Sequence, residues 1–196
     1  MKTVHRVYDN YADAEQAVRN LKDAGIPDAD ISIIGNRGGV DSYKDVAYSN
    51  KPEATEAGLG VGAAVGGGAG LLAGLGLLAI PGLGPVVAAG WLAATALGAV
   101  TGAAAGGIVG ALVDAGVPEQ DAHVYSEAIR RGGTMVTVRY PDELRDRVIA
   151  AFDVNGFVDI ARRRTEYETA GWQRFDPEAG DYKPTPADIE RTRRYG

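Results

Sequence analysis

The feature that most constrains this chain is an insert, residues 58–113, that contains no charged side chain. Of the 28 glycines in the sequence, 17 fall between positions 58 and 110, and all 20 basic and 26 acidic residues lie outside the insert. A segment this long and this apolar has to be covered by protein or by lipid, because soluble proteins rarely expose large contiguous apolar patches. The sequence therefore reads as a charged, ordinary domain interrupted by a segment of different composition.

The spacing of the glycines predicts how the insert packs. Residues four apart lie on the same face of a helix, and a row of small residues there lets a second backbone approach closely. Two such series flank the turn sequence "PGLGP" at 81–85: Gly58, Gly62, Gly66, Gly70 and Gly74, then Gly90, Ala94, Gly98, Gly102, Gly106 and Gly110. We expect a glycine-zipper helical hairpin over residues 57–114. Since each interior glycine costs a helix about 0.5–1 kcal/mol, close packing in a homo-oligomer has to offset that cost.

Two other interpretations of the glycine-rich segment are excluded. A flexible linker is polar, whereas this segment carries leucine, isoleucine, valine and tryptophan. The stretches "GLGVGA" (58–63) and "GLGLLA" (74–79) fit a dinucleotide-binding pattern. Neither follows a predicted strand, and no acidic residue lies about twenty positions further on, as that fingerprint requires. No cofactor is expected.

Whether the hairpin lies in a membrane stays open at this stage. Residues 57–80 and 86–113 are long enough as helices to cross a bilayer core of about 30 Å. Glycine and alanine contribute little to insertion, so a soluble assembly with buried hairpins is the alternative. Residues 1–25 lack the apolar core of a signal peptide. The expected location is the cytoplasmic side of the inner membrane, or the cytoplasm as a large assembly.

The flanking sequence predicts an α+β domain. Strand patterns occur at 3–8, 30–34, 134–140 and 157–161, and helical patterns lie between them, with helix starts at Asn10, Pro118 and Pro141. The order β-α-β, insert and helix, then β-α-β is typical of the ferredoxin-like split β-α-β fold. Residues 1–56 and 115–163 would form this domain, with the insert between its second and third strands. Its expected core comprises Val18, Leu21, Ile33, Val136, Val138 and Val148.

The C-terminal segment, residues 164–196, has few apolar residues, so disorder is one interpretation. The alternative is that an extended segment docks its aromatic side chains on a surface of the same chain or of a neighbour. The aromatic residues that would dock are Tyr167, Trp172, Phe175 and Tyr182.

Composition excludes several kinds of chemistry. The net charge of −6 argues against a nucleic-acid partner, and the absence of cysteine excludes disulfides and thiol catalysis. His5 and His123 show no spacing typical of a metal site. Residues 162–164, "RRR", fit either a phosphate or lipid-headgroup contact or a solvated charged run. By fold analogy alone, His5 or Arg139 would line a ligand site on the sheet. No nucleophile–base pair is evident, so we expect no enzyme.

Three stretches resemble a bacterial general-stress-protein domain family, whose members are described as heat-induced or low-temperature-induced proteins. They are "VYDNYADAEQAVRNLKDAGIPDADISIIG" (7–35), the insert, and "GVPEQDAHVYSEAIRRGGTMVTVRYPDE" (116–143). The resemblance covers roughly residues 3–160 and leaves out the C-terminal segment. It implies a stress-linked protein and supplies no catalytic residues.

The leading hypothesis is therefore a non-enzymatic stress-response protein that self-assembles through its helical hairpin at a membrane. A soluble ring or filament with hairpins buried between subunits is the alternative. A module that senses a small ligand on the sheet is the second alternative.

Overall fold

The computed structural model describes residues 1–36, 76–80, 83–95, 107–153, 156–179, 182 and 185. The strands are β1 (Lys2–Tyr8), β2 (Ile31–Asn36), β3 (Gly76–Ile80), β4 (Gly84–Ala89) and β5 (Thr134–Tyr140). The helices are α1 (Tyr11–Asp23), α5 (Gly107–Asp114), α6 (Glu119–Arg130), α7 (Arg145–Asp153) and α8 (Ile160–Thr169). Short 3-10 turns occupy Asp28–Asp30 and Asp142–Leu144. The chain is thus α+β, as the sequence predicts.

The sheet is antiparallel, with strand order β1-β5-β2-β4-β3. β5 lies between β1 and β2 although it follows them by about a hundred residues along the chain. β1, α1 and β2 with β5 between the two strands match the first split β-α-β unit expected from the sequence, whereas β4 and β3, from the insert, extend the sheet beyond β2. Asn10 begins α1 as predicted, because its side chain accepts a hydrogen bond from the Asp13 N–H at 2.8 Å.

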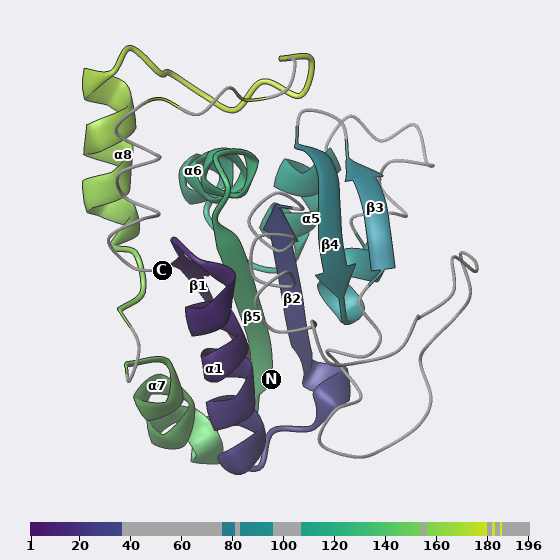
Figure 1. Cartoon of the computed structure of the whole chain (residues 1–196). Helices are drawn as coiled ribbons and strands as arrows, with labels where there is room; N and C mark the ends of the chain where they lie inside the picture. Colours follow the sequence, from purple (N-terminus) through teal and green to yellow (C-terminus); the bar gives the residue numbers. More distant parts are fainter. Residues whose placement is uncertain are drawn as a thin grey trace.

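Alternating side chains of the sheet enter two apolar layers. One layer packs under α1 and α7, the other under α5 and α6, and Figure 1 shows α8 at the side of the molecule, beyond α6. The six core residues expected from the sequence are all fully buried in the α1/α7 layer. The opposite layer includes Val7, Ile34, Leu92, Leu112, Ile129 and Met135.

The predicted fourth strand at 157–161 is wrong. Residues 156–159 are irregular, and α8 begins at Ile160. The Asp159 side chain accepts hydrogen bonds from the backbone N–H groups of Ala161 and Arg162, at 2.9 and 3.0 Å, which caps the helix. The segment still runs beside β1, since the Val158 N–H donates to the Val7 carbonyl at 2.7 Å.

The helical hairpin prediction is wrong over residues 76–80 and 84–89, which form the strands β3 and β4. The two strands pair across a reversal near the predicted turn at 81–85. Val86 and Ala88 enter one apolar layer, and Val87 and Ala89 enter the other. A short apolar run cannot distinguish a buried helix from a strand that is buried on both faces. Pairing with β2 decides in favour of the strand.

Two of the predicted zipper glycines lie in the described residues. Gly90 directly follows β4 and has φ +93°, a value outside the range of a right-handed helix. A Cβ there would lie 2.3 Å from the Ile31 carbonyl oxygen. Gly110 is in α5, but a Cβ there would meet nothing within 4 Å. The other eight, Gly58, Gly62, Gly66, Gly70, Gly74, Gly98, Gly102 and Gly106, lie outside the described residues. So does most of the proposed membrane hairpin. Within the described part, no helix has the length and apolar character needed to cross a bilayer.

Candidate functional site

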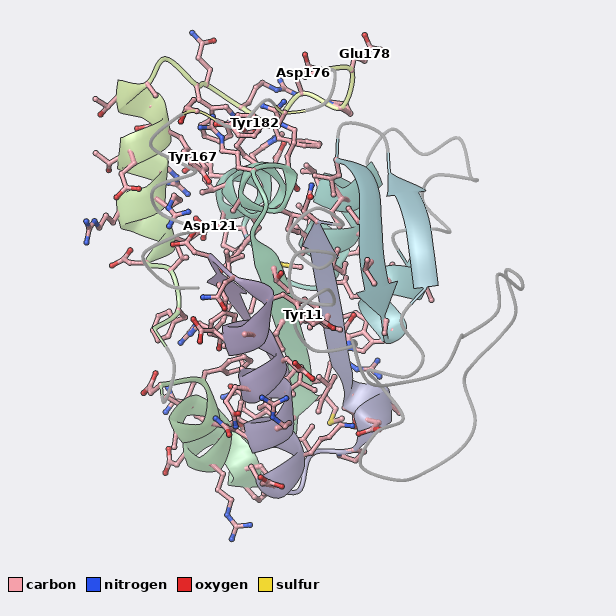
Figure 2. The ribbon with its side chains drawn as sticks, viewed as in Figure 1. Tyr11, Asp121, Tyr167, Asp176, Glu178 and Tyr182 are labelled. Atoms are coloured by element: carbon pink, nitrogen blue, oxygen red, sulfur yellow. The ribbon has the colours of Figure 1, made fainter. Side chains whose placement is uncertain are left out.

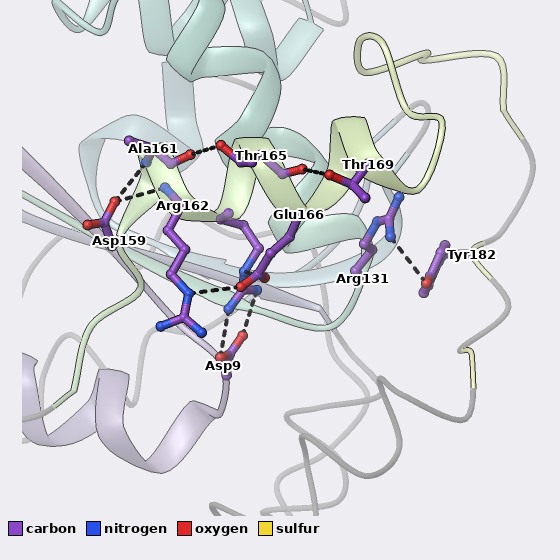
Figure 3. Close-up of polar contacts among 10 residues, drawn as sticks. Asp9, Arg131, Asp159, Ala161, Arg162, Thr165, Glu166, Thr169 and Tyr182 are labelled. Atoms are coloured by element: carbon purple, nitrogen blue, oxygen red, sulfur yellow. Dashed lines mark hydrogen bonds and ion pairs between the residues drawn. The ribbon is translucent and has the colours of Figure 1, made fainter.

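The C-terminal segment packs on the α+β domain through α8, which a largely buried ion pair joins to the segment between β1 and α1. Arg163 donates two hydrogen bonds to the carboxylate of Asp9, Nη1 to Oδ1 and Nη2 to Oδ2, each 2.8 Å. Figure 3 shows Asp9 below α8, at the point where β1 turns into α1. The Arg163 side chain is only 9% exposed and that of Asp9 22%. A bidentate pair of this kind fixes both distance and orientation.

A buried carboxylate on α6 forms the second contact region. Glu127 is fully buried and accepts hydrogen bonds from Arg130 Nη2 at 2.8 Å and from Arg131 Nε at 2.6 Å. Burial disfavours the charged form of Arg131, but the hydrogen bond and the negative charge of Glu127 outweigh it and raise its pKa. A buried charge is tolerated only when it is paired and hydrogen-bonded in this way.

Aromatic rings of the C-terminal segment cover the two guanidinium groups. The Arg131 Cζ lies 4.2 Å from the ring centre of Tyr167 and 4.9 Å from that of Tyr182. The Tyr182 ring is also 5.3 Å from the Arg130 Cζ. Figure 2 shows Tyr167 on α8 and Tyr182 above α6. Cation–π contacts strengthen when they are shielded from water, as here.

The remaining aromatic residues of the segment enter the apolar layer under α5 and α6. Phe175 is 2% exposed and belongs to that layer, and Trp172 packs against it. Trp172 also meets Tyr167 edge-on, with ring centres 5.6 Å apart. The structure therefore places all four aromatic residues named from the sequence on one surface of the same chain. Tyr167 lies on a helix rather than in an extended segment, so the expected boundary after residue 163 falls inside α8.

The arginine run at 162–164 separates into three different environments. Arg163 is the buried partner of Asp9, and Arg164 pairs with Asp121 at the start of α6. Arg162 is exposed and pairs with Glu166 one helical turn away at 3.1 Å, as Figure 3 shows. Since each guanidinium has a carboxylate partner, the run is not an open anion site in the described part of the chain.

A second group of polar residues lies on the sheet face below α6. His5 Nδ1 and Thr137 Oγ1 are 3.0 Å apart, and the rings of His5 and Tyr125 are 6.2 Å apart. Burial, with a smaller contribution from Arg6, lowers the pKa of His5 to about 4. Burial also raises the pKa of Tyr125 to about 12. His5 is thus a neutral imidazole at neutral pH.

Arg139, the other residue considered for a sheet-face ligand, already has partners. Its Nη2 lies 3.0 Å from Asp30 Oδ1 and donates to the Ala29 carbonyl at 3.2 Å, and its Cζ is 4.6 Å from the Trp91 ring centre. His123 is on α6 and His5 is on β1. In the described ranges, no group of three or more His, Cys, Asp or Glu residues is arranged to hold a metal ion.

Sequence reasoning missed the polar contacts beneath the aromatic residues. The i, i+3 and i+4 spacing of Glu127, Arg130 and Arg131 is a readable helix ion-pair pattern. Nothing in that spacing says that the carboxylate is fully buried. The pair between Asp9 and Arg163 joins positions 154 residues apart, which no local pattern reveals.

Residues 3–76 match the family described as Heat induced stress protein YflT domain. The match runs from β1 to the first residue of β3 and confirms the resemblance over that part of the chain. The resemblance of residues 116–143 stays a prediction. Searches of curated proteins and of solved structures gave no match.

Proposed function

We propose that this chain is a non-catalytic stress-response protein that self-associates through its charge-free insert. The match to a heat-induced stress protein family supports the stress-response role. The observation that carries self-association is that the insert contributes β4 and β3 to the sheet of the domain, with charge-free β3 at its edge. All the charges that make up the net −6 lie in other segments. Copies therefore repel one another less where their inserts meet.

The chemistry of the described polar residues supports a non-enzymatic role. His5 and Thr137 are residue types that can act as a general base and a nucleophile, but Thr137 is fully buried. An imidazole with a pKa of about 4 is a weak base at neutral pH. The same burial argues against this face as a ligand-sensing site.

Particle mass in detergent-free buffer tests the proposal. Light scattering after size exclusion should give a mass well above the 20.4 kDa of one chain. The double substitution Gly102→Leu and Gly106→Leu tests the part of the glycine-zipper prediction that lies outside the described residues, where overpacking a close contact would cost about 1–3 kcal/mol per copy. We expect the particle to dissociate. A wild-type chain that runs as a monomer at all concentrations would refute self-association.

The membrane version of the proposal makes a separate prediction. If the insert enters a bilayer, the chain stays with the membrane pellet after alkaline carbonate extraction. Release into the supernatant, together with a large particle, supports the ring or filament version instead.

A further inference from the structure

The two edges of the sheet differ in how they are protected against pairing with another strand. β1 forms one edge and carries Lys2, His5 and Arg6, and its Val7 carbonyl already accepts the Val158 N–H. β3, "GLLAI", forms the opposite edge, and among the described strands it pairs with β4 alone. It contains neither a charged residue nor a proline. Natural proteins protect exposed edges with just those residues. In Figure 1, β3 is the outermost strand on the right.

Pro85 establishes which peptide groups of β3 face outward. Residues opposite each other in antiparallel strands alternate between hydrogen-bonded and non-hydrogen-bonded pairs. Ala79 lies opposite Pro85, and proline has no N–H to donate, so that pair is a non-hydrogen-bonded one. Leu77, opposite Val87, is then also in a non-hydrogen-bonded pair. The N–H and C=O groups of Leu77 and Ala79 therefore point away from β4.

The rest of the sheet is consistent with this alternation. When the same alternation is continued across β4, β2 and β5, the Asn36 N–H points towards β5 and the Val7 carbonyl points away from the sheet. Two observed bonds agree: the Asn36 N–H donates to the Gly133 carbonyl at 3.4 Å, and Val7 accepts from Val158. The outward direction of the Leu77 and Ala79 peptide groups is thus consistent with the hydrogen bonds observed at β2 and β1.

A second copy of the same strand satisfies these outward groups. In an antiparallel β3–β3 pair centred on Leu78, Leu77 of each copy lies opposite Ala79 of the other. The outward N–H and C=O groups of Leu77 and Ala79 in both copies then all have hydrogen-bond partners. β3 carries no charged residue, so this pair places no like charges opposite each other.

We propose that β3 pairs antiparallel with β3 of a second copy, centred on Leu78, and joins the two sheets about a twofold axis. This inference rests on the proposed self-association and specifies the contact. The interface is isologous and closes at two copies. Larger particles would need another part of the insert.

Cysteine cross-linking tests the contact directly, because the chain has no cysteine of its own. Leu78 would face itself in a non-hydrogen-bonded pair with Cα atoms about 4.5 Å apart, which a disulfide can bridge. The variant Leu78→Cys should form a covalent dimer under mild oxidation. Lys2→Cys on β1 is the matched control, since its side chain is exposed and reports random thiol collisions.

A proline substitution provides an independent readout. Leu77→Pro removes an outward N–H and leaves the hydrogen bonds to β4 in place, because edge strands accept proline at such a position. We expect a lower particle mass with an unchanged melting temperature of the monomer. If wild type is oligomeric but Leu78→Cys cross-links no faster than Lys2→Cys, the β3 contact is wrong and self-association stands. A monomeric wild type overturns both.

Discussion

Arg163 on α8 and Asp9 at the end of β1 form a two-bond ion pair across 154 residues of sequence. Replacing Arg163 with Met leaves the Asp9 carboxylate without that partner. Breaking a buried pair from one side costs about 3–5 kcal/mol. Because the Asp9 side chain is partly exposed, we expect a loss of about 3 kcal/mol. Urea denaturation measures the loss, and hydrogen exchange shows whether α8 detaches.

The neighbouring Arg162→Met is the control for this substitution. Arg162 is 81% exposed and pairs with Glu166 on the surface, so its removal should cost less than about 0.5 kcal/mol. Equal losses at both positions would mean that the ion pair does not hold α8 on the domain.

Gly90→Ala tests the end of β4. The residue has φ +93°, and its Cβ would lie 2.3 Å from the Ile31 carbonyl oxygen, a backbone atom that cannot move aside. Gly25 has nearly the same φ, +90°, with nothing within 4 Å of a Cβ. Gly25→Ala should cost about 1–2 kcal/mol from the left-handed conformation alone, and Gly90→Ala about 1–3 kcal/mol more. Equal melting temperatures for the two variants would contradict the close contact.

The pH dependence of stability tests the burial of His5. The pKa of His5 is lowered from 6.5 to about 4, so the folded state takes up this proton at lower pH than the unfolded state. The stability that the protein gains from keeping His5 neutral is complete above about pH 7 and is lost progressively as pH falls from 6.5 towards 4. His5→Gln should flatten this part of the curve. The assignment fails if an NMR titration shows the His5 ring protonating near pH 6.5.

Phe175→Ala tests whether the C-terminal segment is part of the folded domain. Phe175 is 2% exposed in the apolar layer under α5 and α6, and truncating a buried phenylalanine costs about 3–5 kcal/mol. Val113→Ala, at a side chain that is 40% exposed, should change the free energy of unfolding by less than about 0.5 kcal/mol. A small loss at Phe175, with rapid hydrogen exchange at 171–179, would show that the segment does not dock.

Local patterns predicted the elements that form the centre of the fold. The helical spacing of Ala14, Val18 and Leu21 indicates α1, and the alternation in "TMVTVRY" indicates β5. Once these are placed, the split β-α-β order follows from the known preference of such units. The six core residues were also predictable, because each lies on the apolar face of its own element.

The errors occurred where local patterns were ambiguous. Residues 84–89 are apolar on both faces, so their periodicity does not separate helix from strand, and pairing with β2 decides. At 157–161 the capping side chain of Asp159 outweighed a short β-like run. For the C-terminal segment, spacing indicated aromatic contacts, but it could not show that Tyr167 and Tyr182 meet the guanidinium groups of α6. Only the tertiary fold places this segment against that helix.

The position of β5 between β1 and β2 has a consequence for how the chain is made. β2 ends at Asn36 and β5 begins at Thr134, so the 97 residues between them are synthesised before the middle strand begins. At about 5–20 residues per second, this takes roughly 5–20 s. During that interval β1 and β2 have no strand to join them, and the charge-free insert leaves the ribosome ahead of β5. The yield of folded protein should therefore depend on translation speed and on chaperones that bind extended apolar segments.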